Sequence, residues 1–457
     1  MRRLPPLFLA AIVAACAPTS PPTPEPVAVP AHWRAQAGDA QPQPAPAEWW
    51  KTFGDPQLDR LVDQALRANA DIGQAAARVL QARAALAGAE AELRPAVNAF
   101  AGVDQVRLPA MRLGGQNFAP EDDTWPYAGF GFDYEVDLLG RLAKGARSAA
   151  GAAAAAEFER QQVRQSVAHE VVKAYLELRH AETLAEIDAR RADLAETLAV
   201  QERRRLASGL SDRQRVNEAE RGVRDIRIAQ TQDQRERELA RARLALLVSR
   251  PVDTLALPGR PGRAPNLAVE AGLPASAVGR RPDVQAAWQR LLAATTDIGR
   301  AELERYPRVT LTGLAGIVAS GFSGWLASDA VGWIVGAAGR LPLYDGGRIQ
   351  ARVDAAAAVR DERFAAYRRS VYLALAEVES ALVEWQTART ALEFHASQWA
   401  SRRQDAARRS EALELGRASR AELLRLQLAA SDAETAVSSA NYQRMQAYAA
   451  VQRALGR

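Results

Sequence analysis

Four histidines and one cysteine are the residues in this sequence best suited to metal binding or nucleophilic chemistry. The histidines are scattered, without HExxH spacing, and no nucleophile-elbow motif accompanies them (His32, His169, His180 and His395). The single cysteine, Cys16, leaves no partner for a disulfide within the chain or for a multi-cysteine metal site. The sequence therefore predicts a protein that is not an enzyme and that uses no metal and no bound cofactor.

Cys16 lies in a setting that predicts covalent lipid attachment. Two arginines precede an apolar stretch at 7–13, and small residues then lead to the cysteine, which is the order found in a bacterial lipobox. We therefore expect residues 1–15 to be a signal peptide and Cys16 to carry a lipid such as palmitate. Because Ala17 follows, rather than the aspartate that favours retention at the inner membrane, the expected location is the outer membrane, facing the periplasm. A secretory signal that contains a cysteine by chance is the alternative.

The charge of the chain is spread along its length. Lysine and arginine number 59 and aspartate and glutamate 54, which gives a formal net charge of +5 in 457 residues. Acids and bases alternate, as at 235–238, and no aromatic platform accompanies the arginines. We interpret most of this charge as a solvated helix surface and exclude nucleic acid as a partner.

The same order of features occurs twice along the chain, which indicates an internal duplication. Gly140-Arg141 matches Gly347-Arg348, and Gly209 matches Gly416, with similar spacings between these landmarks. A proline-rich stretch before the first copy predicts an extended tether. The predicted organisation is a signal peptide at 1–15, a lipid anchor and tether at 16–47, a first repeat at 48–250, a connector at 251–274 and a second repeat at 275–457.

Each repeat is predicted to contain one shorter helix, two strands and two long helices joined by a turn. The long helices have the apolar period of a coiled coil, as at Val371, Val378 and Trp385, with Arg389 out of character. A helix of about sixty residues spans about 90 Å, which suits a spacer or a tunnel. The predicted bounds are helix 55–93, strands 96–106 and 127–137, and long helices ending at 207 and 248 in the first repeat, then helix 283–305, strands 308–318 and 331–343, and long helices ending at 415 and at the C-terminus in the second.

Residues 130–137 alternate between aromatic or apolar and acidic side chains. This is the pattern of a membrane β-barrel with lipid outside and water inside, although a half-buried soluble sheet would look alike in one strand. The predicted lumen face carries Asp133, Glu135 and Asp137. Because four strands cannot close a barrel and an open edge cannot lie in lipid, several chains must share one barrel if these strands cross the membrane.

Five motifs along the chain are distinctive in this order: Trp49–Leu58, Asn69–Ile72, Tyr134–Arg141, Gly279–Val284 and Leu343–Arg348. Together they resemble the TolC-like outer-membrane efflux proteins, specifically the lipoprotein branch that serves resistance-nodulation-division drug pumps. The resemblance covers essentially everything from Trp49 onward.

The resemblance implies a mainly α-helical chain with four strands, of which three copies form a twelve-stranded barrel and a helical periplasmic tunnel. It also implies a passive channel without a cofactor. The implied partners are two further copies of the chain, outer-membrane lipid, a periplasmic adaptor (a membrane fusion protein) and an inner-membrane resistance-nodulation-division transporter.

The family also suggests where the tunnel ends and where it is gated. The tunnel-tip turns and the adaptor-docking residues would be Gly209, Ser211, Arg215, Gly416 and Ser419. The gate candidates are Glu422, which falls where family members often have an acid ring, and Arg425. A solvated helix residue is the alternative interpretation of Glu422.

Three residues depart from the family pattern and bear on docking, gating and local packing. Arg425 replaces a frequent acid one turn after Glu422, a spacing that allows the two to pair. Arg215 replaces a common aspartate, and Trp288 replaces an acid after the Arg-Arg-Pro-Asp motif. These changes affect the expected details of the gate and not the expected fold.

Two other functions remain open at this point. A structural coiled-coil lipoprotein would have the helices without a channel. A channel of the same architecture for type I protein secretion or for polysaccharide export would have both the helices and the channel. The lipobox and the Trp49–Leu58 motif favour drug efflux.

Overall fold

The computed structural model describes residues 27–35, 48–108, 111–113, 116–118, 121–255, 257, 267–319 and 330–457. Cys16, the predicted signal peptide and most of the predicted tether lie outside these residues. The described chain forms two compact units: a strand unit of residues 78–156 and 286–367, and a hairpin unit of residues 27–77, 157–285 and 368–457. None of the helices in these ranges has a stretch long and apolar enough to cross a membrane.

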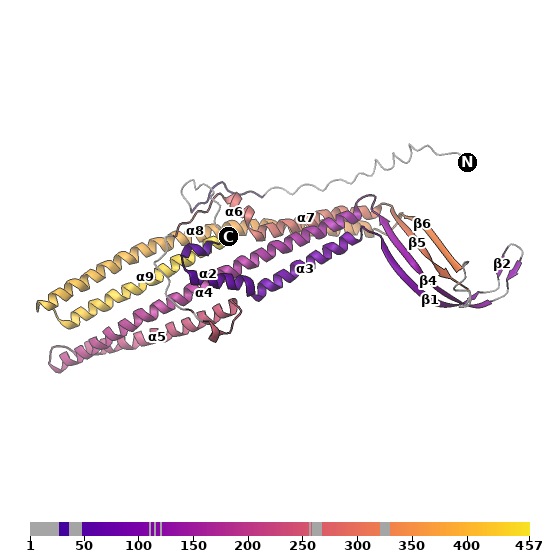
Figure 1. Ribbon diagram of the computed structural model, residues 1–457. Helices are drawn as coiled ribbons and strands as arrows, with labels where there is room; N and C mark the ends of the chain where they lie inside the picture. The colour runs from indigo at the N-terminus through magenta and orange to yellow at the C-terminus, as the bar shows by residue number, and fades with distance from the viewer. Residues whose placement is uncertain are drawn as a thin grey trace. The chain divides into compact units, whose positions relative to one another are not determined.

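The element order repeats along the chain (Figure 1). The first half contains η1 (Trp49–Phe53), α2 (Pro56–Ala68), α3 (Ala70–Ala91), β1 (Ala96–Leu108), β2 (Met111–Leu113), β3 (Gln116–Phe118), β4 (Glu121–Val136), α4 (Arg141–Ala207), α5 (Arg213–Leu247) and η2 (Val252–Thr254). The second half contains α6 (Pro274–Arg280), α7 (Pro282–Glu302), η3 (Leu303–Arg305), β5 (Arg308–Val318), β6 (Val331–Arg340), α8 (Arg348–Glu414) and α9 (Arg420–Ala454). The small hairpin of β2 and β3 was not predicted.

Four antiparallel strands form the sheet of the strand unit, in the order β1-β4-β5-β6 (Figure 1). The pairing of β4 with β5 joins the two repeats, with Phe132 opposite Gly313. A side chain at Gly313 would clash with the Phe132 ring, so glycine makes room for the aromatic on the neighbouring strand. β1 and β6 lie at the two edges of this sheet, and every residue of β6 is exposed.

Aspartates position the start of the long helix in both repeats. Asp137 accepts hydrogen bonds from the backbone N–H groups of Leu142 (3.1 Å) and Ala143 (2.8 Å), and Asp345 accepts from Ile349 at 2.6 Å. The first N–H groups of a helix have no partner within the helix, so a preceding carboxylate satisfies them. β4 ends at Val136, one residue before the predicted end, so Asp137 lies just past the strand and bonds the first turn of α4; its place on the lumen face stays a prediction.

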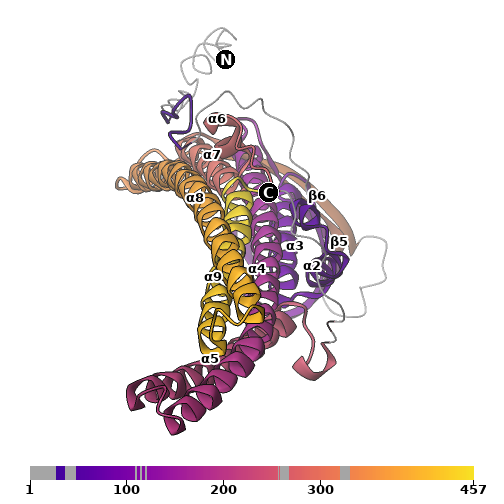
Figure 2. The ribbon, with the colours of Figure 1, turned by 90° about the vertical axis from the view of Figure 1, so that its left-hand side faces the viewer.

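The predicted coiled-coil positions form the buried stripes of the hairpin unit. On α8, Val371, Val378 and Trp385 are all buried, as are Val171 and Leu178 on α4. Arg389, the residue out of character, is exposed, and its guanidinium lies 5.9 Å from the centre of the Trp385 ring. Figures 1 and 2 show α4 with α5, and α8 with α9, as antiparallel pairs.

The Trp49–Leu58 motif supplies an aromatic core and a helix cap. Trp49 and Phe53 are buried with their rings 6.3 and 5.7 Å from that of Tyr448. Asp55 caps α2 by accepting from the backbone of Gln57 at 2.9 Å, and it also accepts a hydrogen bond from the Tyr175 hydroxyl. The motif therefore fixes α2 against α4 and α9.

Two predictions about the first residues of the folded body need correction. The single predicted helix at 55–93 is two helices, because Asn69 ends α2 and caps α3, accepting from Asp71 at 2.9 Å while donating to the Leu247 carbonyl at 3.0 Å. Part of the predicted tether is docked rather than free. Trp33 is buried, and its indole donates to the Gly272 carbonyl at 2.8 Å.

Candidate gate at the hairpin turns

Two turns of the same construction join the long helices. Gly209 and Gly416 each have φ near +69°, in the left-handed region that favours glycine. At each turn the N–H of the third residue past the helix donates back to the last helical turn: Leu210 donates to the Arg205 carbonyl at 2.8 Å, and Arg417 donates to the Ala412 carbonyl at 2.7 Å. The sequence placed both turns correctly, because glycine is needed where the backbone reverses.

The next helix begins at a capping residue in both hairpins. Asp212 accepts from the backbone N–H of Arg215 at 2.8 Å, which starts α5. Ser419 and Glu422 form a reciprocal capping box at the start of α9, with both hydrogen bonds at 3.2 Å. The turns are thus fixed by local chemistry, and they position the charged side chains around them.

Glu202 connects the first hairpin to the second. It is fully buried near the end of α4, and it accepts a hydrogen bond from the Ser211 hydroxyl at 2.6 Å. Its other oxygen accepts from the Arg425 guanidinium of α9 at 2.7 Å. A buried carboxylate is stable only when its oxygens are satisfied, and Ser211 and Arg425 provide that satisfaction from two different elements.

This geometry changes the expected partner of Arg425. The sequence spacing allowed a pair with Glu422, but the ion pair that Arg425 makes in the structure is with Glu202. Glu422 instead faces Arg409 of α8, at 3.5 Å, within its own hairpin. The reason is that the buried Glu202 needs a cation, whereas Glu422 is already held by the cap.

Glu422 is exposed and stays ionised. The hydrogen bond from the Ser419 backbone and the positive charges of Arg409 and Arg205 lower the pKa of Glu422 below its usual value. The side chain therefore carries a negative charge at neutral pH. Arg215 is also exposed, and its nearest acid is Asp212 of the same turn, at 3.7 Å.

An apolar cluster and a polar hollow adjoin the Glu202–Arg425 pair. Leu198, Ala421 and Leu424 are buried together, so the two hairpins share a small core here. The hollow has a volume of about 370 Å³ and is lined by residues of α4, α5 and α9, among them Glu202 and Arg425. The Glu202–Arg425 ion pair and this apolar cluster therefore join the two hairpins near their turns.

A family comparison identifies the class of protein to which these hairpins belong. The model of the outer membrane efflux protein family matches residues 61–250 and 273–457. The chain belongs to the outer membrane efflux proteins. OpmQ, the pyoverdine export outer membrane protein of Pseudomonas aeruginosa, is 30% identical over 380 residues, which are 81% of this chain and 79% of OpmQ. Outer membrane protein OprJ of the same species is 31% identical over 391 residues, or 84% of this chain and 80% of OprJ.

A solved channel has the same fold as this efflux protein. The structure of the outer-membrane channel OprN has a TM-score of 0.84 and 28% sequence identity, and the match covers 96% of this chain and 98% of that one. The predicted family and fold class are therefore confirmed, and the efflux protein has its place in the outer membrane. Its relatives are components of efflux systems rather than enzymes.

Two of the four histidines of this efflux protein, His169 and His180, are packed among helices. Burial lowers the pKa of His169 and of His180 to about 4, so both rings are neutral at neutral pH. The His180 ring stacks on Tyr442 with centroids 4.4 Å apart. Within the described residues no group of three or more His, Cys, Asp or Glu side chains is arranged to hold a metal ion.

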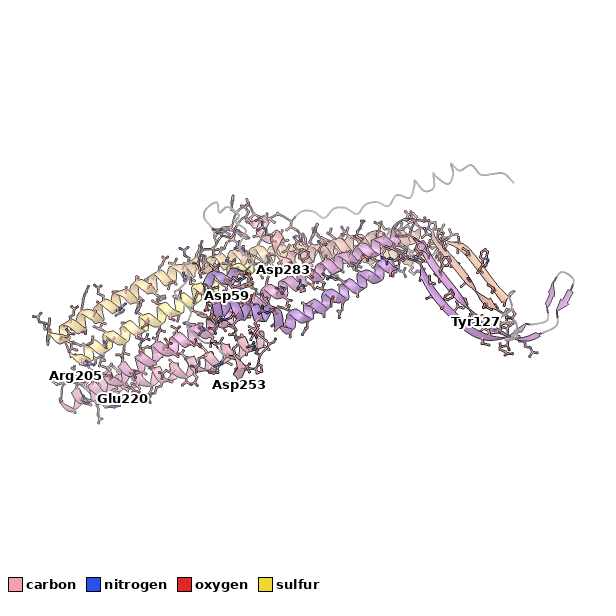
Figure 3. All side chains as sticks on the ribbon, in the orientation of Figure 1. Asp59, Tyr127, Arg205, Glu220, Asp253 and Asp283 are labelled. Atoms are coloured by element: carbon pink, nitrogen blue, oxygen red, sulfur yellow. The ribbon has the colours of Figure 1, made fainter. Side chains whose placement is uncertain are left out.

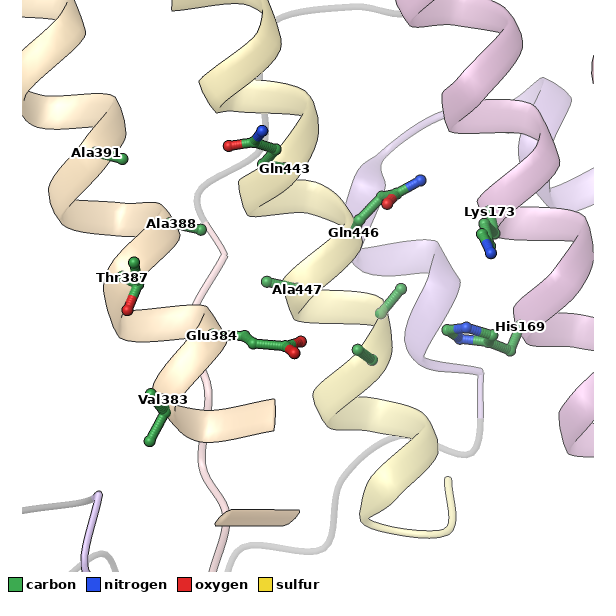
Figure 4. Close-up of a pocket in the computed structure, with 12 residues that line it drawn as sticks. His169, Lys173, Val383, Glu384, Thr387, Ala388, Ala391, Gln443, Gln446 and Ala447 are labelled. Atoms are coloured by element: carbon green, nitrogen blue, oxygen red, sulfur yellow. The ribbon is translucent and has the colours of Figure 1, made fainter. Parts of the chain in front are cut away.

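A second hollow, of about 460 Å³, adjoins His169 (Figure 4). Lys173 of α4, Glu384 of α8, and Gln443 and Gln446 of α9 line it. These side chains offer hydrogen bonds and both signs of charge but no nucleophile activated by a base.

The predicted lumen acids of the efflux protein differ in their surroundings. Asp133 is exposed on β4, whereas Glu135 accepts a hydrogen bond from Arg141 at 2.8 Å, near the start of α4. The face that they share also holds Tyr127, whose ring lies 6.1 Å from that of Phe100.

Trp288, the other departure from the family pattern, packs against Tyr367 with ring centroids 5.2 Å apart.

Sequence analysis missed Glu202 and Arg191, which both link α4 to α9. A signal was present, because charged residues occupy positions that continue the apolar period through Leu194 and Leu198. A charged side chain at such a buried position needs an oppositely charged partner on the facing helix. The identity of that partner, more than 200 residues away, had no signature in the sequence.

Proposed function

We propose that three copies of this chain form a channel that passively conducts small toxic compounds through the outer membrane for an efflux pump. The observation that carries the proposal is the sheet whose edge strands, β1 and β6, have a partner on one side only among the residues that the structure describes. An unpaired edge is unstable in lipid, where no water satisfies the backbone, so the edges of neighbouring copies must pair. Relatives of the chain are named as the outer membrane proteins of a toluene efflux pump and of a solvent efflux pump of Pseudomonas putida, and these names support the choice of cargo.

The hairpins would form the wall of a tunnel, and their turns would form its end. There a periplasmic adaptor would dock on the surface around Gly209, Ser211 and Arg215 in the first hairpin and around Gly416 and Ser419 in the second. An inner-membrane transporter of the resistance-nodulation-division class would supply the energy. The lipobox supports a lipid on Cys16 as an additional anchor, with two or more acyl chains for stable attachment.

The assembly is tested first by the mass of the purified protein. We expect the full-length protein in mild detergent to have three times the mass of the chain by light scattering corrected for detergent. The physical reason is that the backbone groups of β1 and β6 gain partners only through neighbouring copies. A folded single chain at every concentration would contradict the shared barrel.

Glu422 is expected to govern ion preference at the tunnel end. Three carboxylates near one axis attract cations, so the channel in a planar bilayer should prefer cations over anions. Glu422→Gln keeps the cap geometry and removes the charge, and we expect it to reduce the cation preference severalfold. Because the pKa of Glu422 is lowered, the preference should persist as the pH falls and disappear only below the usual carboxyl range.

Glu414→Gln is the matched control for this measurement. Glu414 is exposed at the end of α8, next to the same turn, and the substitution removes the same charge. It should leave the cation preference unchanged. Equal effects of the two variants would remove Glu422 from the gate without affecting the trimer test.

A further inference from the structure

Two buried carboxyl groups face one another between α4 and α5, away from the hairpin turns. Asp188 of α4 is 4% exposed and Asp233 of α5 is 7% exposed. The Asp233 carboxyl lies close enough to that of Asp188 for the two groups to interact, and its Oδ2 has no hydrogen-bond partner among the residues that the structure describes. Gln230 bridges the same two helices by donating to the Asp188 carbonyl at 3.2 Å.

One arginine serves these acids and also the second hairpin. Arg191 donates to Asp188 at 2.5 Å through one nitrogen and to Asp432 of α9 at 2.5 Å through another. The charged groups that act on Asp233 are Asp188 and Arg191 from α4 and Glu236 from α5, with Asp432 of α9 reached through Arg191. The carboxyl groups thus outnumber the single guanidinium among them.

This imbalance favours a proton on the pair. Burial, followed by the adjacent charge of Asp188, raises the pKa of Asp233 from 3.8 to about 6. With the proton present, Asp233 donates to Asp188 and the Arg191 charge is available to Asp432. Without it, two buried carboxylates repel each other and both draw on Arg191, which weakens the contact with α9.

We propose that Asp188 and Asp233 form a proton-binding site that strengthens the contact between the first hairpin and α9 when occupied and weakens it when empty. The inference depends on the proposed function only for its consequence, which is a tunnel wall that loosens as the surroundings become less acidic. The ligand is the proton itself, so the site needs no partner protein and no metal.

The expected direction follows from proton linkage. Opening here means the separation of α5 from α4. The closed hairpin binds the proton more tightly than the opened hairpin does, so opening becomes easier as the pH rises from 3.8 through about 6. If Asp233 regains its ordinary pKa when α5 opens, the opening equilibrium at about pH 7.5 is about tenfold greater than at about pH 5. This is measurable by amide hydrogen exchange of α5 in the purified full-length protein, corrected for the intrinsic pH dependence of exchange.

Asp233→Asn imitates the protonated side chain, and it should make the corrected exchange of α5 equal at the two pH values. Asp225→Asn is the matched control, because it removes an exposed carboxylate from the same helix, and it should keep the tenfold difference. Asp432→Asn should keep the pH dependence in α5 and abolish it in α9. Equal wild-type exchange at both pH values, or loss of the difference in Asp225→Asn, would overturn the site.

Infrared spectroscopy of the wild-type protein provides a test that does not depend on any variant folding. A buried protonated carboxyl has its own C=O stretching band, which should fade as the pH rises through about 6. The absence of a titrating band would also refute the inference. Neither measurement involves conductance, so a failure here is distinguishable from a failure of the channel proposal.

Discussion

Glu202→Gln is expected to increase the conductance of the channel about fivefold. The substitution keeps the shape of the side chain and an acceptor for Ser211, but it removes the negative charge that holds Arg425 across the two hairpins. The Arg425 side chain is 42% exposed, so we assign the lost pair about 1 kcal/mol rather than the larger value of a fully buried one. A change of about 1 kcal/mol in the free energy of the closed state shifts the equilibrium between closed and open channels about fivefold.

The matched control is Glu220→Gln. Glu220, labelled with Arg205 in Figure 3, pairs with Arg203 at 2.7 Å within the first hairpin, so its loss breaks an ion pair without separating the hairpins. Arg425→Gln should raise the conductance at least as much as Glu202→Gln does, because it leaves the buried Glu202 carboxylate without its cation, and the double variant should behave like Glu202→Gln alone. An unchanged conductance in Glu202→Gln, or an equal increase in Glu220→Gln, would show that this pair does not hold the tunnel closed.

Arg281→Ala is expected to lower the free energy of unfolding of the hairpin unit by about 3 kcal/mol. Arg281 is 7% exposed and donates to Asp283 and to the Ala454 carbonyl, each at 2.7 Å, and to Glu377 of α8 at 2.6 Å. Its removal leaves a buried carbonyl and two carboxylates without their cation. Denaturant unfolding followed by circular dichroism of the helices would measure the loss.

Arg280 provides the comparison for this variant within the same motif. It is exposed, so Arg280→Ala should change the free energy of unfolding by less than about 0.5 kcal/mol. Arg281→Lys should fall between the two, because lysine keeps the charge but cannot reproduce the forked geometry of guanidinium. Similar losses in the Arg280 and Arg281 variants would mean that the motif acts through its charge rather than through these three contacts.

Much of the secondary structure was predictable because it follows from local patterns. Strand β5 has the predicted bounds, 308–318, and α4 ends at the predicted residue 207. Alternation specifies a strand, a period near 3.6 specifies a helix, and a glycine at a reversal specifies a turn. Each of these signals lies within a few residues of the feature that it predicts.

The predictions that failed depended on contacts between distant parts of the chain. Asn69 divides a predicted helix because its side chain also donates to the Leu247 carbonyl. Trp33, within the predicted tether, is fixed to the folded body because its indole N–H donates to the Gly272 carbonyl. Arg425 was matched to a neighbour one turn away, but it pairs with Glu202, 223 residues earlier. Local spacing cannot show which buried group elsewhere needs a charge.

The sequence by itself determined the duplication, the long helices, the four main strands and the family, because each depends on the order and period of residues along one chain. Only the tertiary structure decided which charges meet: Glu202 with Arg425, Arg191 with Asp188 and Asp432, and Asp188 with Asp233. Burial makes an unpaired charge unstable, so packing selects partners by proximity in space. The residues to which we assign opening and proton binding are defined by that packing.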